Sequence, residues 1–250
     1  MNVEVPGDKS LTQRALILAA LAGGESRLSG LLYGGDAEST AGALRALGVT
    51  SLRAVVCTHP DSDHSSALPY LLRTLPVARL FVGRDPAPAL VQAARQSGVP
   101  IVHAAAGDVV YRAGEARLTI LAADGGPRAS ANERSLALLF EVAGQRVLVP
   151  ADRTEVGLRD LLRRGVPPCD VLIAPHHGGR CADATRVGAA VRPRWLLVSV
   201  ARGFAHEATL AAYGATEGVR TTASNGCLFV RFPASGGVEV DTFRATIRPP

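Results

Sequence analysis

Hydrophobic and polar residues follow one another in short blocks, and from residue 51 onward these blocks alternate between two periods. Short apolar runs bounded by Gly, Pro, Asn or Asp are typical of strands, and apolar residues spaced three and four apart are typical of helices. The alternation predicts an α/β protein built from layered sheets and helices. The expected strands are 52–57, 79–82, 100–103, 117–122, 135–142, 145–150, 170–174, 195–200 and 227–232, and the expected helices are 65–74, 87–97, 154–164, 183–191 and 207–217.

The segment 117–150 departs from this alternation. Two apolar runs, 135–142 and 145–150, are separated only by Ala143 and Gly144. A two-residue link that contains glycine predicts an antiparallel hairpin. The sheet is therefore expected to be mixed.

Residues 1–49 show a different pattern. Ser10 and Gln13 form a capping box in front of the amphipathic run 11–21, which predicts a helix there. A second helix is expected over 36–47. This opening segment contains no cluster of candidate metal ligands.

Composition bounds the class of protein. The chain has 250 residues, of which 47% are hydrophobic, enough to bury a core in one large or two small domains. Its 4 cysteines lie far apart with no CxxC pair, which is typical of a reducing compartment. No apolar run reaches the roughly 18 residues of a membrane helix, and 16–22 lacks the flanks of a signal peptide. We expect a cytoplasmic protein, or a soluble domain near the membrane.

Histidine and aspartate side chains gather directly after several of the expected strands. A tight group follows strand 52–57, and others follow 145–150, 170–174 and 195–200. Because the ends of successive strands can meet at one edge of a sheet, we expect these side chains to converge. Imidazole nitrogen and carboxylate oxygen are ligands that suit zinc or manganese. The candidate metal ligands are His59, Asp61, Asp63, His64, Asp152, His176 and His177.

The alternative is that these histidines are ordinary surface or hydrogen-bonded core residues, which is the commoner role of a lone histidine. Five of the 6 histidines fall at strand ends, and this clustering favours a metal site. His206 is expected to have a catalytic role close to the substrate rather than on the metal, and His103 to be structural. Which residue of the pair His176 and His177 is the ligand stays open.

Three motifs in this part of the chain carry a resemblance. They are THPDSDH at 58–64, VLVPAD at 147–152 and APHHGGR at 174–180. Together they resemble the metallo-β-lactamase superfamily, and more narrowly the hydrolase domain of the bacterial competence protein ComEC. The resemblance implies an αββα sandwich with mixed sheets, here without its first strands, because no VGQGD-like turn or IDGG-like loop is present.

The same resemblance assigns roles to the candidate ligands. It implies one metal site at Asp63, His64, Asp152 and one of the paired histidines, and a poorer second site at His59 and Asp61 with Asp152 bridging. A divalent ion lowers the pKa of bound water to about 7, and a second ion stabilises the attacking and leaving oxygens together. Asp61 or Asp63 could orient this water or accept its proton. The implied cofactor is one or two ions of zinc or manganese, and the implied substrate a phosphodiester such as DNA.

The opening segment resembles a different family. Residues 3–49, VEVPGDKSLTQRALILAALAGGESRLSGLLYGGDAESTAGALRALGV, are similar to the amino-terminal segment of EPSP synthase (3-phosphoshikimate 1-carboxyvinyltransferase). The resemblance implies that Lys9, Ser10 and Arg14 bind anionic substrates, because an ammonium, a hydroxyl at a helix N-terminus and a guanidinium together cradle an anion. The match stops at Val49 and the rest of the synthase has no counterpart, so we expect no synthase activity.

These two resemblances predict a fusion of an EPSP synthase-like fragment, residues 1–49, with a hydrolase domain, residues 50–250. A sheet without its first strands leaves an unpaired edge and uncovered apolar faces, so self-association is expected. A role in DNA uptake would require a membrane-channel partner. Three hypotheses follow: a metal-dependent hydrolase acting on phosphodiesters, a remnant that binds metal without turnover, and a transferase fragment.

Overall fold

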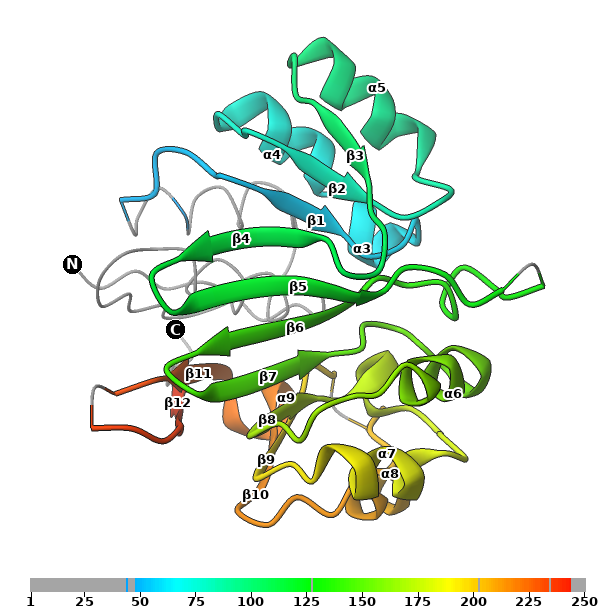
Figure 1. Ribbon diagram of the computed structural model, residues 1–250, viewed down its shortest axis with the longest axis vertical. Helices are drawn as coiled ribbons and strands as arrows, with labels where there is room; N and C mark the ends of the chain where they lie inside the picture. The colour runs from blue at the N-terminus through cyan, green and yellow to red at the C-terminus, as the bar shows by residue number, and fades with distance from the viewer. Residues whose placement is uncertain (1–43, 45–47, 127, 202, 234, 244–250) are drawn as a thin grey trace, which may run out of the picture.

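The computed structural model describes residues 44, 48–126, 128–201, 203–233 and 235–243. Within these residues the elements form four layers in the order helices, sheet, sheet, helices (Figure 1). This arrangement confirms the expected α/β fold with mixed sheets. The expected helices 11–21 and 36–47 lie outside the described residues, apart from Leu44.

The first sheet is small and parallel, with its three strands in sequence order. It is covered by helices on one face and by the second sheet on the other, so its strands are rich in apolar residues. The elements of this half are β1 (Val55–Cys57), α3 (Ser62–Ser65), α4 (Leu68–Thr74), β2 (Leu80–Val82), α5 (Pro88–Gln96) and β3 (Ile101–His103).

The second sheet has seven strands in the order β10-β9-β8-β7-β6-β5-β4. Strands β4 to β7 are antiparallel to their neighbours, and strands β7 to β10 are parallel. The carboxyl ends of β7, β8 and β9 therefore open at one edge. The strands are β4 (Val109–Ala113), β5 (Ala116–Ala122), β6 (Ala137–Val142), β7 (Gln145–Val149), β8 (Val171–Ile173), β9 (Trp195–Val198) and β10 (Gly218–Thr221).

The core between the sheets follows from the two-residue period of the strands. Leu138 and Phe140 of β6 face the first sheet and share a buried cluster with Phe81 of β2. Leu139, between them, belongs to the cluster formed with the helices on the outer face. Adjacent side chains of a strand point to opposite faces, so one strand contributes to two layers of the core.

Helices α6, α7 and α8 pack on the outer face of the second sheet (Figure 1). The β11–β12 hairpin adds Leu228 and Val238 to the core between the sheets. These elements are α6 (Glu155–Arg163), η1 (Pro175–Gly178), α7 (Ala184–Val191), α8 (Glu207–Ala212), α9 (Thr222–Asn225), β11 (Cys227–Arg231) and β12 (Glu239–Phe243).

The expected hairpin around Ala143 and Gly144 is confirmed by the antiparallel pairing of β6 with β7. Both turn residues have positive φ, 49° and 78°, as a two-residue hairpin turn requires. The expected helix 207–217 is too long, because it ends at Ala212 and Gly214 takes a φ of 65°. The expected helix 65–74 begins later, as α4 at Leu68, and a separate short helix, α3, precedes it. Strands β4, β10 and β12 were not expected from the sequence pattern.

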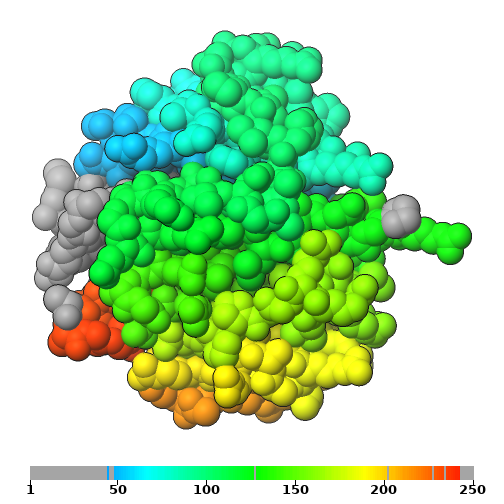
Figure 2. Space-filling model, viewed as in Figure 1, coloured from blue at the N-terminus to red at the C-terminus, as the bar shows by residue number. Residues whose placement is uncertain are grey.

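Part of the connection between β5 and β6 stands out from the body of the molecule (Figures 1 and 2), whereas its last residues, Ser135 and Leu136, are buried. It starts at the same edge of the second sheet as the segment that follows β7. Among the described residues, no helix combines the length and the apolarity needed to cross a membrane.

Candidate metal centre

Three separate segments bring their side chains to one edge of the two sheets. Residues 59–64 follow β1, Asp152 follows β7, and His177 follows β8. The carboxyl ends of parallel strands are where loops meet in such sheets, which is why residues far apart in sequence become neighbours. The structure therefore brings together side chains from three of the four strand ends that the sequence analysis named.

The Asp152 carboxylate lies at the centre of the cluster. Its Oδ1 atom is 3.4 Å from Nε2 of His64, and its Oδ2 atom is 3.4 Å from Nε2 of His177 and 3.9 Å from Nε2 of His59. All four residues are buried. Three imidazole nitrogens thus point at one carboxylate in an interior position.

Two further carboxylates lie on the solvent side of this cluster. Asp63 Oδ2 is 3.6 Å from His64 Nε2 and 3.5 Å from His177 Nε2. Asp61 Oδ2 is 3.7 Å from His59 Nε2. The Asp61 and Asp63 side chains are about half exposed, so the cluster is closed on its inner side and open on its outer side.

Two overlapping sets of ligand atoms in the described part of the chain are compact enough to hold a cation. One set is His59, His64 and Asp152, and the other is Asp63, His64 and His177. His64 belongs to both. This grouping differs from the expected division, which placed His64 in one site only.

The protonation states of the cluster suit a cation. Burial, together with the neighbouring His64 imidazole, lowers the pKa of His59 to about 4. Burial alone would raise the pKa of Asp152, but its interactions with the neighbouring His177 and His64 imidazoles outweigh burial and hold that pKa well below its usual range. At neutral pH His59 is therefore neutral and Asp152 ionised, which are the forms that bind metal.

The buried polar atoms of the cluster provide a test of whether a cation fits. The Nε2 atoms of His59 and His64 and the Oδ1 atom of Asp152 are buried and have no hydrogen-bond partner among the described residues. Such atoms are costly to bury unless something satisfies them. A divalent ion accepts both kinds of donor atom, so the residues fit one.

Hydrogen bonds behind the histidines orient their rings. His177 Nδ1 donates to the backbone carbonyl of Ser199, at 3.1 Å, directly after β9. A carbonyl can only accept, so in the neutral ring the proton is on Nδ1 and the Nε2 lone pair faces Asp152. His59 Nδ1 lies 3.1 Å from the Thr58 hydroxyl.

The backbone around His177 is unusual. His176 and His177 have φ angles of 47° and 55°, in the left-handed region, and Ala151 has a φ of 54°. The His176 backbone N–H donates to the Ala151 carbonyl at 3.1 Å, which joins the two ligand-bearing turns. Left-handed non-glycine residues cluster at functional sites because the surrounding structure must hold them.

The paired histidines have different environments. His177 is buried and takes part in the cluster, whereas His176 is exposed and belongs to neither set of candidate ligand atoms. The left-handed backbone of the two histidines continues into Gly178, whose φ is 75°. The geometry thus favours His177 as the ligand.

The other expected residues lie outside the two ligand sets. His206 caps the N-terminus of α8, where its Nδ1 accepts from the Thr209 backbone N–H at 3.3 Å. Its own backbone N–H donates to Gly178 at 3.0 Å, so it is near the turn that carries His177. His103 is exposed at the end of β3. The expected anion-binding residues Lys9, Ser10 and Arg14 lie outside the described residues.

Sequence reasoning missed Arg153, the residue after Asp152. Its side chain is fully buried and donates to the carbonyls of Ser135 at 2.8 Å and Gly157 at 3.0 Å. Burial lowers its pKa to about 10. Arg153 thereby ties the turn after β7 to the connection before β6. Its position beside a candidate ligand was the only available signal.

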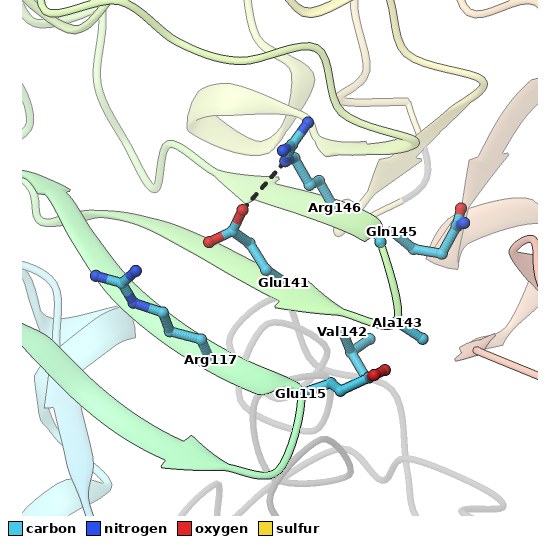
Figure 3. A pocket seen from close by; sticks show the side chains of 8 residues that line it. Glu115, Arg117, Glu141, Val142, Ala143, Gln145 and Arg146 are labelled. Atoms are coloured by element: carbon cyan, nitrogen blue, oxygen red, sulfur yellow. Dashed lines mark hydrogen bonds and ion pairs between the residues drawn. The ribbon is translucent and has the colours of Figure 1, made fainter.

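A recess that is separate from the metal cluster lies at the opposite end of the second sheet, between the β4–β5 and β6–β7 turns (Figure 3). Its volume is about 850 Å³ with its open space included. Arg117, Glu141 and Arg146 line it from adjacent strands, and Arg146 Nε is 3.1 Å from Glu141 Oε1 (Figure 3). Arg146 and Glu141 thus pair across two adjacent strands. The recess lacks the convergent ligands of the metal cluster.

Comparison with known families finds a match at the beginning of the chain. The model of the EPSP synthase family (3-phosphoshikimate 1-carboxyvinyltransferase) matches residues 1–74. The expectation that this match stops at Val49 is therefore wrong, because the match extends through β1, α3 and α4. The boundary of the two expected domains, at residues 49 and 50, stays a prediction.

Curated relatives of this segment carry the same name. The 3-phosphoshikimate 1-carboxyvinyltransferase of Rhodopseudomonas palustris strain TIE-1 is 57% identical over 56 residues, which are 22% of this chain and 13% of the relative. That of Nitrobacter winogradskyi is 64% identical over 47 residues, 19% of this chain and 10% of the relative. The chain spans about a tenth of the length of these relatives.

Solved structures similar to this chain include a beta-hydroxylase, CmlA, and a zinc-bound protein, PqqB. The CmlA beta-hydroxylase E377D mutant overlays with a TM-score of 0.48 and 15% identity, covering 69% of this chain and 43% of CmlA. Zn(2+)-bound PqqB from Methylobacterium extorquens gives a TM-score of 0.36 and 17% identity, covering 61% of this chain and 54% of PqqB. This chain spans about half of either protein.

Proposed function

We propose that this chain is a metal-dependent hydrolase whose cofactor is one or two divalent ions, zinc or manganese. One observation carries the proposal: three buried imidazole nitrogens, from His59, His64 and His177, surround the Asp152 carboxylate at 3.4 to 3.9 Å. Nitrogen and oxygen donors in this combination are typical of zinc and manganese sites.

The residues of the cluster divide the work by position. His59, His64, His177 and Asp152 hold the cofactor from the buried side. When bound, a divalent ion supplies Lewis-acid chemistry and lowers the pKa of a coordinated water to about 7. Asp63 reaches the cluster from the half-exposed side, where its carboxylate can orient a water or accept a proton.

We further propose that the substrate is a phosphodiester, with DNA as one candidate. The net charge of +5 supports an anionic substrate, and the open outer side of the cluster supports access by a bulky one. A relation to ComEC-like competence proteins, with a membrane-channel partner, stays a prediction from the sequence motifs. A transferase activity would depend on a segment that spans about a tenth of the relatives' length.

Metal content tests the proposal before any assumption about the substrate. Protein purified without chelator should contain one or two divalent ions per chain by elemental analysis. His64→Ala should remove most of this metal, because His64 belongs to both ligand sets. His103→Ala is the matched control, because His103 is exposed and belongs to neither ligand set. Equal metal content in both variants would exclude the site.

Activity is measured separately on bis(p-nitrophenyl) phosphate with added Mn²⁺ or Zn²⁺. We expect hydrolysis by the wild type and a large loss in Asp63→Ala. Metal binding with equal, negligible hydrolysis in both would favour the second hypothesis, a remnant that binds metal without turnover. The observation that supports this second hypothesis is the match of residues 1–74 to a different enzyme family, EPSP synthase.

A further inference from the structure

A small pocket adjoins the metal cluster, and His59 belongs to both the cluster and the pocket wall. The pocket occupies about 330 Å³ with its open mouth included, and Thr58, Arg84, Asp85 and Arg134 are among the residues that line it. The proposed hydrolase chemistry makes no use of this pocket. It lies where a substrate reaching the cluster from this side would place a neighbouring group.

The topology explains why these residues meet. Strands β1 and β2 are parallel, so the turn after β2, which carries Arg84 and Asp85, opens beside the turn that carries His59. The connection between β5 and β6 closes the third side. Its last residues are fixed there, because the Leu136 backbone N–H donates to the Thr58 carbonyl at 2.9 Å.

Arg134 is the built element of the pocket. Its Nη1 atom donates to the Ala129 carbonyl at 2.7 Å, which anchors the guanidinium, and its Nη2 atom is 3.2 Å from Asp85 Oδ2. The Arg134 side chain is 24% exposed and that of Asp85 is 63% exposed. A guanidinium has five N–H donors, so these two contacts leave donors for a further oxyanion.

The space in the pocket points to how an anion would enter. With Arg134 on Asp85, the room for the centre of a water-sized group is about 20 Å³, which is roughly one water. A larger anion therefore has to take the place of the exposed Asp85 carboxylate. Arg84, which is exposed on the same turn, adds a second positive charge at the mouth.

We infer that Arg134, assisted by Arg84, forms an oxyanion subsite that holds a phosphate group of the substrate beside the metal cluster. The Asp85 carboxylate pairs with the Arg134 guanidinium until the phosphate group displaces it. Arginine suits this role because its planar fork matches the oxygens of a phosphate. The role in catalysis rests on the proposed hydrolase function, but the binding of the anion does not.

The competing explanation is that the Arg134–Asp85 ion pair only straps two loops together. The two explanations differ in the sign of one effect. If the pair is a strap, Arg134→Gln and Asp85→Asn break the same contact and change phosphate binding in the same direction. If Arg134 binds phosphate and Asp85 competes with it, the two variants change binding in opposite directions.

The test is a calorimetric titration of inorganic phosphate into the full-length chain at constant ionic strength. Chelator is present throughout, so that metal contributes nothing. We expect Arg134→Gln to weaken binding about tenfold, the loss typical of a hydrogen bond to a charged group. Asp85→Asn should tighten binding severalfold. Arg95→Gln, on the exposed face of α5, is the matched control and should leave binding unchanged.

Two results would overturn the inference. One is weaker phosphate binding in both Arg134→Gln and Asp85→Asn, which supports the strap. The other is tighter binding of acetate than of phosphate, which assigns the subsite to carboxylates. If the wild type contains no metal in the elemental analysis but still binds phosphate, the hydrolase proposal fails and the subsite remains. The two failures are therefore distinguishable.

Discussion

Acidification of the metal-free protein should destabilise it through His59. Burial and the adjacent His64 lower the pKa of His59 from 6.5 to about 4 in the folded chain. Between these two pH values the unfolded chain binds a proton that the folded chain does not. The His59 contribution to stability is thus fully present above pH 6.5 and is lost as the pH falls toward 4.

The size of this effect follows from the two pKa values. Each unit of difference is worth about 1.4 kcal/mol, so the whole difference corresponds to a loss of about 3 kcal/mol in the free energy of unfolding. That is a large part of the roughly 5 to 15 kcal/mol of a typical domain. Asp152, whose pKa is also lowered, loses its contribution only below the ordinary pKa of a carboxyl, so the two effects occupy separate pH ranges.

Urea unfolding in the presence of chelator measures the effect. The chain has one tryptophan, Trp195 in β9, whose fluorescence reports on the second sheet. We expect the free energy of unfolding to fall by about 3 kcal/mol between pH 7 and pH 4. His59→Gln should remove most of this dependence. An equally steep pH dependence in His59→Gln would refute the reasoning.

Two further predictions concern the turn after β8. His177→Ala should lose most of the bound metal in elemental analysis and His176→Ala should retain it, because only His177 faces the cluster; equal loss in both would contradict this assignment. Gly178→Ala should lower the free energy of unfolding by about 2 kcal/mol or more, because a Cβ there would be both strained and within 2.9 Å of two side chains. Gly144→Ala is the control, since its φ of 78° is similar but no atom lies within 4 Å of a Cβ at that position. This variant should lower the free energy of unfolding by only about 1 kcal/mol. Similar losses of stability for the two variants in urea unfolding would show that the crowding at Gly178 contributes nothing.

Much of the fold was predictable because apolar runs are local signals. The nine expected strands all appear, most of them shortened by one to three residues. Strands β4, β10 and β12 were missed, because runs such as Val109–Ala113 mix polar and apolar residues and depend on their partners for pairing. The helix 207–217 was overextended because its apolar period continues past Ala212, where Gly214 turns the chain.

The sequence by itself determined which residues are available to a cation, because histidines and aspartates placed directly after strands meet wherever those strands share an edge. It also determined the mixed character of the second sheet, through the Ala143-Gly144 link. Only the tertiary structure decided that His177 rather than His176 faces Asp152. The direction of a side chain depends on backbone angles and on a hydrogen bond to Ser199, and such long-range contacts leave no trace in local patterning.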